Sequence, residues 1–422
     1  MIGLFGGTCN NMYVMAKFLA RHDHSVCFIE DRSENFPHSQ PVWDDVDVHF
    51  RAGFDYRAID WSKFESEYNW VPPEWYFKPR RLGGGALEVF KESPAPLIVK
   101  VLACRYLRTY KEVHSVFKKM MECDHLIVCG IRPAIIAMLT GKPYMIFPHG
   151  SDMRVAVGVE RKGSGFKGRM VEWLVSRSFE SAKVIGSSLP TAGAPADKNL
   201  YRRLCNLTVS RLPLPYDSVR RLPDFERRAA LRLLFKEIDV ALPAAKYYCF
   251  TPSRINFHWK GHDRLLRAVK QYQGELNIHF IFLGWGDDYS AAVDYVNDNH
   301  LAGLVTVLPL FLSKKFLLRF FSAVDFMIDS LNGAGGYGTS LSEAMSVGCP
   351  VVTWISDIFD QPGWERPPVM QACTEEELGS TMRAISRGSI DLSQQSAVMA
   401  DWFFRVHSGD VVLKSLENEL LG

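Results

Sequence analysis

The sequence predicts an α/β protein with two doubly wound domains, and three observations lead to that prediction. Short apolar runs alternate with amphipathic helical patterns along most of the chain, which is typical of parallel sheets covered by helices on both faces. The opening run IGLF is followed by Gly6 and Gly7, where a doubly wound domain makes its first tight turn. Three prolines within LTVSRLPLPYDSVRRLP then indicate a boundary between two domains, as expected for a chain of 422 residues.

In the first domain, residues 2–5 predict a buried strand, followed by a helix at about 11–21 and a second strand that ends at Asp31. The acidic residue at this strand end leaves a dinucleotide-binding domain open as an alternative, although the G-x-G-x-x-G fingerprint is missing. Residues 33–95 have a poor pattern and predict irregular surface structure with one or two short strands. Residues 97–122 predict one long basic amphipathic helix. Further strands are expected at 125–130, 143–150 and 182–188, with a helix at about 133–140.

The alternation of strands and helices restarts after the proline-rich stretch. A last amphipathic helix at about 409–421 is expected to return to the first domain. We therefore place the domains at 1–208 and 209–400, with 401–422 as the returning segment. Ligands of such sheets bind at the carboxyl ends of the strands, so the expected site is a cleft between the two domains. The other expected elements are strands at 246–254, 277–284, 304–310 and 324–330 and helices at 226–236, 262–273, 288–299 and 313–322.

Composition and charge argue against several classes of protein. The net charge is only +2, so no overall electrostatic attraction to nucleic acid is expected. The nine cysteines are scattered without a Cys-x-x-Cys pair, which is typical of reduced thiols rather than of disulfides or a zinc site. The sequence MIGLFGG lacks the features of a signal peptide, and no apolar run approaches the roughly 20 residues of a spanning helix. We therefore expect a cytoplasmic protein.

Lysines and arginines are concentrated in one part of the chain. Residues 100–183 contain 15 of them against 7 acidic residues. The basic segments 100–119 and 161–177 predict peripheral contact with the inner face of a membrane, or with a phosphorylated acceptor. An ordinary solvated surface is the alternative that the sequence leaves open.

The segment GAGGYGTSLSEAMSVGCPVV, residues 333–352, is the strongest candidate for a binding site. Its glycines allow close approach of the backbone to a ligand, and a helix-compatible run follows them directly. The first turn of a helix offers unpaired N–H groups and the positive end of a dipole, which together favour phosphate. Glu343 lies about one turn into that helix, where a carboxylate can accept hydrogen bonds from sugar hydroxyls. A plain connection of loop, helix and strand is the alternative.

Two cations indicate the same chemistry. Arg254 ends an expected strand, and Lys260 follows six residues later, before Gly261 and a helix. Arginine supplies a planar fork and lysine a point charge, so the pair can converge on one diphosphate. Gly284 and Gly286 form a second glycine turn after the next strand. Each cation taken alone is typical of a protein surface. The two indicate a diphosphate site only together with the glycine-rich helix start.

In chain order, these segments resemble the retaining glycosyltransferases of family 4, which have a GT-B fold. PLPYD at 213–217 resembles the segment that opens the donor domain, and SRINFHWKG at 253–261 resembles the Arg…Lys-Gly motif. FLGWGDD at 282–288 resembles the Gly-x-Gly loop, and residues 335–352 resemble the signature with two glutamates eight residues apart. PHGSD at 148–152 resembles the His-Gly/Asp loop of the first domain. The resemblance covers the second domain well and the first loosely.

The resemblance implies a role for each matching residue. Arg254 and Lys260 would neutralise the leaving diphosphate, and Glu343 would bind the ribose. His149 would face the reacting sugar from the first domain, and Asp152 is a weaker candidate in the same loop. A histidine at this place that only caps a turn is the alternative. Further contacts with donor or phosphate are expected from Gly6, Gly7, Gly284, Gly286, Gly336, Tyr337, Gly338 and Thr339.

One position departs from the family pattern. The first signature glutamate, which helps to hold the transferred sugar, falls at Gly335 in this sequence. An unusual donor sugar, a carboxylate supplied from elsewhere such as Asp329, or a loss of activity would each account for the difference.

The expected function is a retaining glycosyltransferase of the hexosyltransferase type. It would move a sugar from a nucleotide diphosphate donor, bound by residues 209–400, to a glycan, glycolipid or glycoconjugate in polysaccharide biosynthesis. Residues 1–208 would form the acceptor side. No metal is expected, because two cations already face the diphosphate, and the Asp45-Val46-Asp47 triplet is the alternative metal motif. A non-catalytic nucleotide-sugar-binding or partner subunit, and a GT-B-type epimerase or phosphorylase, remain as alternatives.

Overall fold

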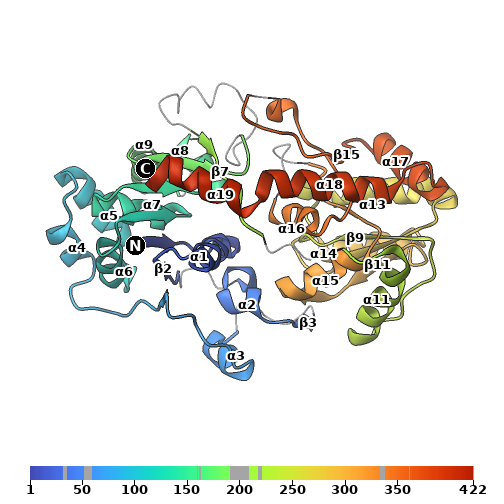
Figure 1. Cartoon of the computed structure of the whole chain (residues 1–422), viewed down its shortest axis with the longest axis horizontal. Coiled ribbons are helices and arrows are strands. Elements are labelled where there is room, and N and C mark those ends of the chain that lie inside the picture. The colour runs from blue at the N-terminus through green and yellow to red at the C-terminus, as the bar shows by residue number, and fades with distance from the viewer. Residues whose placement is uncertain are drawn as a thin grey trace. The chain divides into compact units, whose positions relative to one another are not determined.

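The computed structural model divides the chain into two compact units, and Figure 1 labels the elements of both. Unit 1 contains Met1–Pro41, Glu65–Pro215 and His407–Gly422, and unit 2 contains Val42–Phe64 and Tyr216–Val406. The residues that the structure describes are 1–31, 36–51, 59–158, 160, 163–190, 209–216, 221–332, 338–360 and 362–421. Each cysteine among them is a free thiol.

Unit 1 is built on a parallel sheet with seven strands among the described residues. The first strand along the chain lies in the middle of the sheet, between the second and the fourth. This is the 3-2-1-4-5-6 order of a doubly wound domain, extended by one strand. The strands, in their order across the sheet, are β4 (Tyr76–Phe77), β2 (Val26–Ile29), β1 (Ile2–Phe5), β5 (His125–Val128), β6 (Tyr144–Ile146), β7 (Val184–Ser187) and β8 (Val209–Arg211).

The helices of unit 1 follow its strands along the chain. Side chains from α4 to α9 form one continuous apolar core with one face of the sheet. The helices are α1 (Asn11–Arg21), α4 (Ala86–Glu92), α5 (Leu97–Leu107), α6 (Val113–Met121), α7 (Ile131–Thr140), α8 (Ser151–Ala156), α9 (Gly165–Glu180) and α19 (Gly409–Leu416). Short turns of helix at Thr8–Asn10, Pro37–Ser39 and Glu417–Leu421 complete the unit.

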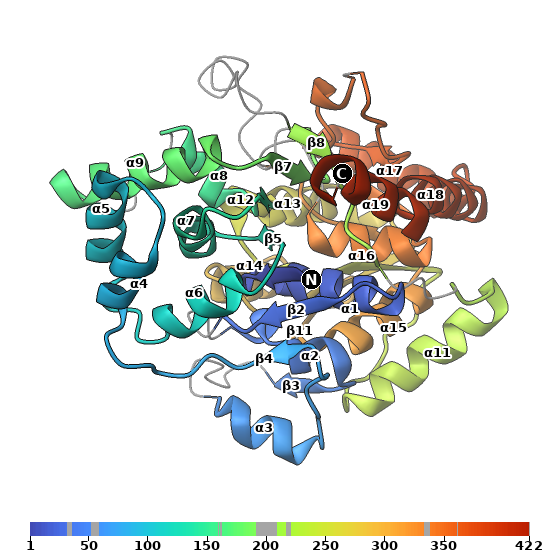
Figure 2. The same ribbon diagram turned by 60° about the vertical axis from the view of Figure 1, so that its left-hand side comes forward.

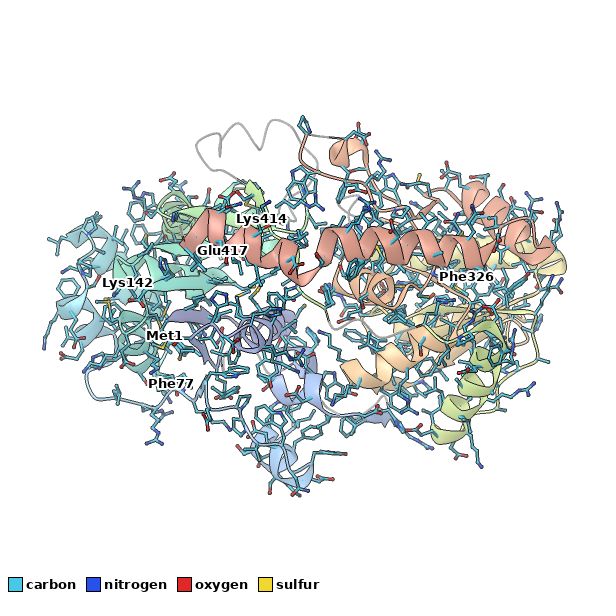
Figure 3. All side chains as sticks on the ribbon, viewed as in Figure 1. Met1, Phe77, Lys142, Phe326, Lys414 and Glu417 are labelled. Atoms are coloured by element: carbon cyan, nitrogen blue, oxygen red, sulfur yellow. The ribbon has the colours of Figure 1, made fainter. Side chains whose placement is uncertain are left out.

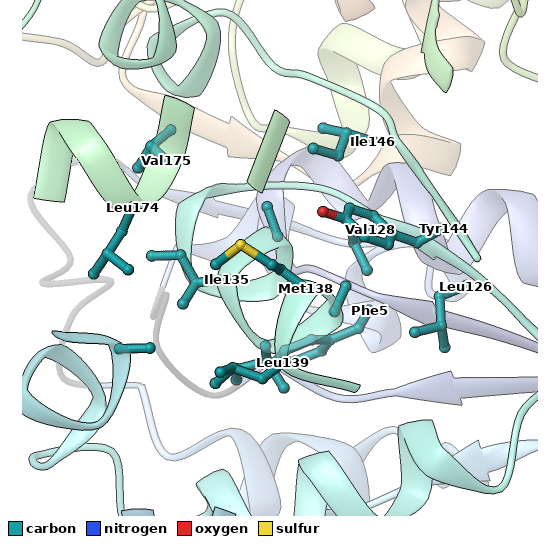
Figure 4. Close-up of a cluster of buried hydrophobic side chains, with 14 of the residues drawn as sticks. Phe5, Leu126, Val128, Ile135, Met138, Leu139, Tyr144, Ile146, Leu174 and Val175 are labelled. Carbon is teal, nitrogen blue, oxygen red and sulfur yellow. The ribbon is translucent and has the colours of Figure 1, made fainter. Parts of the chain in front are cut away.

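Figure 4 shows the centre of this core. Leu126 and Val128 of β5 belong to one apolar cluster with Ile135 and Leu139 of α7, while Ile127 between them is buried on the opposite face of the sheet. Both faces of the central strands are therefore covered, which explains why these strands read as unbroken apolar runs instead of alternating patterns.

Unit 2 contains a second parallel sheet with the same 3-2-1-4-5-6 order. Its strands, in order across the sheet, are β11 (Val305–Leu308), β10 (Ile278–Leu283), β9 (Tyr247–Thr251), β13 (Phe326–Ile328), β14 (Val351–Thr353) and β15 (Met370–Gln371). Its helices are α11 (Asp224–Glu237), α12 (Phe257–Lys260), α13 (His262–Tyr272), α14 (Tyr289–Asp298), α15 (Lys314–Ala323), α16 (Thr339–Val347), α17 (Glu375–Arg387) and α18 (Leu392–His407). These two parallel sheets confirm the predicted α/β class.

Aromatic side chains fill one face of the second sheet. The ring of Phe250 in β9 stacks on that of Phe320 in α15, with 4.9 Å between centroids and 20° between planes. Phe326 of β13, labelled in Figure 3, is fully buried in the core on the other face, among side chains of α13 and α17. Offset aromatic pairs of this kind add to the free energy of burial.

Besides the domain ends, where residues 209–215 belong to unit 1 and residues 401–406 to unit 2, two regions differ from the sequence-based expectations. The single helix expected at 97–122 is two helices, α5 and α6, because Tyr110 between them turns inward and is buried. The guanidinium carbon of Arg132 lies 4.6 Å from the centre of that ring, which holds the turn in place.

The second difference concerns Val42–Phe64, which the sequence analysis placed in the first domain and which packs with unit 2. Its strand β3 (His49–Arg51) pairs antiparallel with β12 (Leu310–Leu312), outside the main sheet. Trp43, in the short helix α2 (Pro41–Asp45), stacks on Phe50 at 5.5 Å between centroids, and Phe64 of α3 (Trp61–Glu67) is buried beside them. Burial of these aromatics therefore attaches an early segment of the chain to unit 2.

We expect His407 to make folding stability pH-dependent. This buried residue lies 3.2 Å, through Nδ1, from the carbonyl oxygen of Leu214, and burial lowers its pKa from 6.5 to about 4. Below pH 6.5, His407 binds a proton in the unfolded chain but stays neutral in the folded chain until the pH approaches 4. The free energy of unfolding therefore decreases as the pH falls from 6.5 toward 4. The loss from one such group is about 1.4 kcal/mol per pH unit.

The test is urea unfolding of wild type and His407→Asn at several pH values. The asparagine amide can still donate to Leu214 but does not titrate, so the variant should lose less free energy of unfolding over this range. Parallel pH profiles for the two proteins would contradict the assignment.

Candidate functional site

The two sheets place their candidate site residues at equivalent points. In a doubly wound sheet, the strand order reverses beside the first strand, and ligands bind at the carboxyl ends of the strands there. In unit 2 this switch point lies between β9 and β13, and in unit 1 between β1 and β5. Arg254 and Lys260 follow β9, and Gly6 and Gly7 follow β1.

A buried carboxylate organises the switch point of unit 2. Asp329 follows β13, is 2% exposed, and accepts a hydrogen bond from the Ser253 hydroxyl at 2.5 Å through Oδ1. Its Oδ2 accepts from the hydroxyl of Ser340 at 3.0 Å and from Lys260 Nζ at 3.5 Å. Since Ser340 lies in the first turn of α16, one carboxylate connects Lys260 to the start of that helix.

The charge state of this carboxylate follows from its partners. Burial works to raise the pKa of Asp329, but Lys260, His262 and the hydroxyls of Ser253 and Ser340 outweigh it and hold that pKa below its usual range. Asp329 is therefore ionised at neutral pH. Both of its oxygens have partners within the protein, and its suggested role as a replacement for the glutamate missing at Gly335 stays a prediction.

His262 extends the network beneath Lys260. Nδ1 of the ring lies 3.2 Å from the backbone nitrogen and 3.3 Å from the carbonyl oxygen of Asn256, and Nε2 lies 3.3 Å from the Ser253 hydroxyl oxygen. Because the Ser253 hydroxyl donates to Asp329, its oxygen can accept a hydrogen bond from Nε2–H. Burial lowers the pKa of His262, which keeps the ring neutral. The sequence analysis did not select this histidine, and its only signal was its position directly after Lys260 and Gly261.

Lys260 and Arg254 differ in how firmly they are held. Lys260 ends the short helix α12, in which the Trp259 N–H donates to the Asn256 side chain, and its Nζ donates to the Ser330 hydroxyl at 2.9 Å. Ser330 has a φ of 56°, a conformation that non-glycine residues rarely adopt and that, where it does occur, can mark a functional site. The Arg254 side chain is exposed and makes no ion pair or hydrogen bond with any residue that the structure describes, so it can bind an anion directly.

Gly286 allows the loop before Lys260 to pack closely, and Gly284 allows the end of β10 to pack closely against the end of β11. A Cβ on Gly286 would lie 2.4 Å from the Ile255 carbonyl oxygen, and one on Gly284 would lie 2.6 Å from that of Leu308. The backbone N–H of Ile255 also donates to the Trp285 carbonyl at 2.6 Å. Gly286 therefore positions residues 253–256, and the predicted contact of both glycines with a donor stays a prediction.

The glycine-rich helix start is described only in part. Gly336 and Tyr337, like Gly335, lie outside the described residues. Gly338 precedes α16, and a Cβ placed on it would meet no atom within 4 Å, so the space beside it is open. Thr339 is the first residue of α16 and Glu343 the fifth.

Glu343 belongs to a buried charge cluster. Lys314 Nζ lies 3.4 Å from Oε1 of Glu343 and 3.4 Å from Oδ1 of Asp44, and all three side chains are largely buried. Burial raises the pKa of Glu343, although Lys314 acts against this. Burial works to lower the pKa of Lys314, but the two carboxylates outweigh it and hold that pKa above its ordinary value. The predicted contact of Glu343 with a ribose stays a prediction, and no sequence pattern indicated Lys314 or Asp44 as its neighbours.

In unit 1, Gly6 makes the switch point possible. It has a φ of 140°, and a Cβ there would lie 2.2 Å from the carbonyl oxygen of Cys129 at the end of β5. A Cβ on Gly7 would be in ordinary contact with Asp31, 3.4 Å from its carbonyl oxygen. Arg132, in the first turn of α7, has Nη1 3.9 Å from Oδ1 of the buried Asp31. A charged pair that the sequence analysis did not foresee therefore stands at this sheet edge.

His149 lies in the loop between β6 and α8 and is held there by Asp152. This fully buried carboxylate accepts hydrogen bonds from the backbone N–H groups of His149 at 3.1 Å, Gly150 at 3.1 Å and Met153 at 2.8 Å. The His149 side chain is 20% exposed, with Nε2 3.9 Å from Oδ2 of Asp152. Asp152 therefore shapes the loop, and His149 keeps part of its ring accessible.

The described residues contain no group of three or more histidine, cysteine, aspartate or glutamate side chains that could hold a metal ion. In the Asp45-Val46-Asp47 triplet, Oδ2 of Asp47 accepts a hydrogen bond from Arg319 at 3.1 Å. Within the described part of the chain, no helix combines the length and the apolar character needed to cross a bilayer.

Comparison with known proteins supports one family and one fold. Residues 246–362 match the family model of the glycosyl transferases group 1, and this range contains every site residue selected in unit 2. No curated protein matches the sequence.

Three solved structures show the similarity over whole chains. HepE of Anabaena, in complex with UDP and glucose, has a TM-score of 0.61 and 12% identity, and the match covers 99% of this chain and 98% of that chain. A glycosyltransferase from Rickettsia africae has a TM-score of 0.58 and 13% identity over 99% and 97% of the two chains. The lipopolysaccharide outer core galactosyltransferase WaaB has a TM-score of 0.52 and 11% identity over 99% of each chain. The predicted GT-B fold is therefore confirmed.

We expect Lys314 to be essential for stability. Lys314→Met should lower the free energy of unfolding by about 3–5 kcal/mol, because it leaves the carboxylates of Asp44 and Glu343 buried without a cation. The loss should shrink as the pH falls, since both carboxyls then take up protons.

Urea unfolding of Lys314→Met measures this loss, and Lys315→Met, which changes the exposed neighbour, is the matched control. Adding Asp44→Asn to Lys314→Met should recover part of the lost stability. Equal unfolding midpoints for the two lysine variants would contradict the cluster.

Proposed function

We propose that this protein is a nucleotide-sugar-dependent glycosyltransferase whose donor site is the switch point of unit 2. The proposal depends on one observation: Lys260 and Ser340, at the start of α16, both contact Oδ2 of Asp329. All three residues lie within 246–362, the range that matches the glycosyl transferases group 1. A cation and a helix N-terminus that converge in this way suit a diphosphate.

In the proposed reaction, the bond between the sugar and the diphosphate breaks, and the nucleoside diphosphate leaves with additional negative charge. Lys260, oriented by Asp329 and Ser330, and Arg254, free of partners among the described residues, would neutralise that charge as it develops. Because Asp329 and Ser330 fix Lys260 before the substrate binds, little reorganisation is needed in the transition state. Gly338 and Thr339, with Gly336 and Tyr337, would contact the phosphates, and Glu343 would bind the ribose.

We propose that unit 1 supplies the acceptor side, with His149 facing the reacting sugar and the loop at Gly6 and Gly7 approaching donor or acceptor. The reaction would retain the anomeric configuration and need no metal, as in the glycosyltransferases of family 4 that the motifs resemble. A hexose is the proposed sugar, and a glycan, glycolipid or glycoconjugate of polysaccharide biosynthesis is the proposed acceptor. Cytoplasmic location and contact of segments 100–119 and 161–177 with the membrane are parts of the same proposal.

Similarity to the HepE structures favours uridine diphosphate as the nucleotide of the donor. The HepE structures, with TM-scores of 0.61 and 0.59, hold UDP with glucose or UDP-glucose. A thermal-shift screen with UDP, GDP, ADP, CDP and TDP tests this choice. The nucleotide that fits should raise apparent stability by about 2.7 kcal/mol at a hundredfold excess over its Kd. A chain that no nucleoside diphosphate stabilises would contradict the donor site.

We expect Arg254→Ala and Lys260→Ala each to lower kcat by a factor of about 10²–10³, because each removes a preorganised charge from the leaving diphosphate. The measurement is release of nucleoside diphosphate from a matched sugar donor and acceptor. Lys315→Ala, which removes an exposed cation elsewhere in unit 2, is the control and should turn over like wild type.

Thermal unfolding separates loss of function from loss of fold in these variants. Arg254→Ala should keep the wild-type midpoint, since the described residues offer its side chain no partner to lose. Lys260→Ala should unfold earlier, because the buried Asp329 carboxylate then lacks its cation. Full turnover in Arg254→Ala would overturn the assigned role. Product analysis with donor alone identifies an epimerase or phosphorylase, and nucleotide binding without turnover identifies a binding subunit.

A further inference from the structure

Helix α5 of unit 1 has an unusual outward face. Leu97 is 66% exposed, Ile98 58% and Val101 46%, whereas Val99, Ala103 and Leu107 of the same helix are buried in the core. The first two turns of α5 are thus apolar on both sides, which differs from the polar outer face of an ordinary surface helix. A group of exposed apolar side chains of this kind indicates an interaction surface.

Helix α9 adds aromatic and basic side chains to this surface. Phe166, Arg169, Trp173 and Arg177 are spaced at i, i+3, i+7 and i+11, which places them along one stripe of the helix. Phe166 is 66% exposed and Trp173 40%. The stripe therefore alternates aromatic rings with cations.

The faces of α5 and α9 are joined. The two helices pack against each other, and the guanidinium carbon of Arg105 in α5 lies 5.7 Å from the centre of the Phe166 ring. Helix α4 packs against α5 and contributes Leu87, which is 59% exposed. Both ribbon views place the three helices together at one side of unit 1 (Figures 1 and 2).

Basic residues outnumber acidic ones on this surface. No acidic residue occurs from Ser93 to Lys111, a stretch that contains Lys100, Arg105, Arg108 and Lys111. The start of α9 adds Lys167 and Arg169. The acidic groups on these helices are Glu88 and Glu92 of α4, paired with Lys91 and His114, and Glu172 and Glu180 of α9, the latter paired with Arg177.

Not every cation of the basic segments belongs to this surface. Lys118 and Lys119 of α6 line a separate cavity of about 650 Å³ beside β4, and Lys119 is paired with Glu122 at 2.7 Å. The contact surface is therefore narrower than the sequence segments 100–119 and 161–177 suggested.

We propose that the outer faces of α4, α5 and α9 form a docking surface for an anionic lipid bilayer. Leucine, isoleucine, valine and phenylalanine would enter the boundary between headgroups and acyl chains, and Trp173 would lie at the level of the headgroups. Arg105, Arg108, Lys167 and Arg169 would face the phosphates of anionic lipids. A bilayer that contains anionic lipids fits this surface because exposed apolar side chains lie next to an excess of cations.

This inference narrows the proposed membrane contact but does not depend on sugar transfer. It is tested with the full-length chain and vesicles of phosphatidylcholine, either alone or with about 30% phosphatidylglycerol at low and high salt. We expect pelleting with the anionic vesicles, weaker binding at high salt, and little binding to phosphatidylcholine alone.

Matched variants locate the contact. Ile98→Ser combined with Phe166→Ser should lower the partition coefficient at least tenfold, and Arg105→Glu with Arg108→Glu should abolish the preference for anionic vesicles. Val71→Ser, which changes an apolar residue that is 81% exposed outside this surface, and Lys118→Glu, on α6, are the controls and should bind like wild type.

Several outcomes would overturn the proposal. They are equal binding to both kinds of vesicle, unchanged binding of the surface variants, or a dimer in size-exclusion chromatography that Ile98→Ser with Phe166→Ser dissociates. Nucleotide binding and the thermal midpoint are measured on the same samples. A chain that docks on vesicles but binds no nucleoside diphosphate would contradict the proposed donor site and leave this surface standing.

Discussion

The candidate site depends on one buried carboxylate. Asp329 is ionised within unit 2, and three segments that are distant in the sequence supply its partners: Ser253 after β9, Lys260 before α13 and Ser340 in α16. Burying a carboxylate without partners costs free energy of folding. The folded structure therefore favours the positions in which Ser253, Lys260 and Ser340 pair with Asp329. The cation of the site is therefore positioned by the fold before any ligand arrives.

The sequence predicts the frame of this site well, for a physical reason. Central strands of a parallel sheet are buried on both faces, so β9, β10 and β13 appear as apolar runs, and ligand-binding residues follow such strands. Arg254 and Lys260 could be selected on that basis alone. Their partners could not, because Ser253 and Asp329 are 76 residues apart and nothing in a local pattern shows which serine reaches which carboxylate.

The segment 42–64 marks a different limit. It has neither the period of a helix nor a long apolar run, and its strand β3 pairs with β12 outside the main sheet. Its attachment to unit 2 depends on stacked aromatic rings and on Asp44, which shares Lys314 with Glu343. Contacts of this kind are set by tertiary packing, so the sequence indicated an irregular surface where the described residues of this segment form two helices and a strand.

The two units share one topology but carry different charges at their switch points, and this difference bears on which unit holds the donor. In unit 1, the guanidinium of Arg132 faces the buried Asp31 carboxylate at 3.9 Å, so its positive charge is already balanced. In unit 2, Asp329 is shared by Lys260 and neutral donors, and the described residues leave Arg254 without a counter-charge. A diphosphate with two or more negative charges is better stabilised in unit 2, because, of Lys260 and Arg254, only Lys260 is paired with a carboxylate among the described residues. The same comparison favours a less charged ligand beside His149, as a sugar acceptor would be.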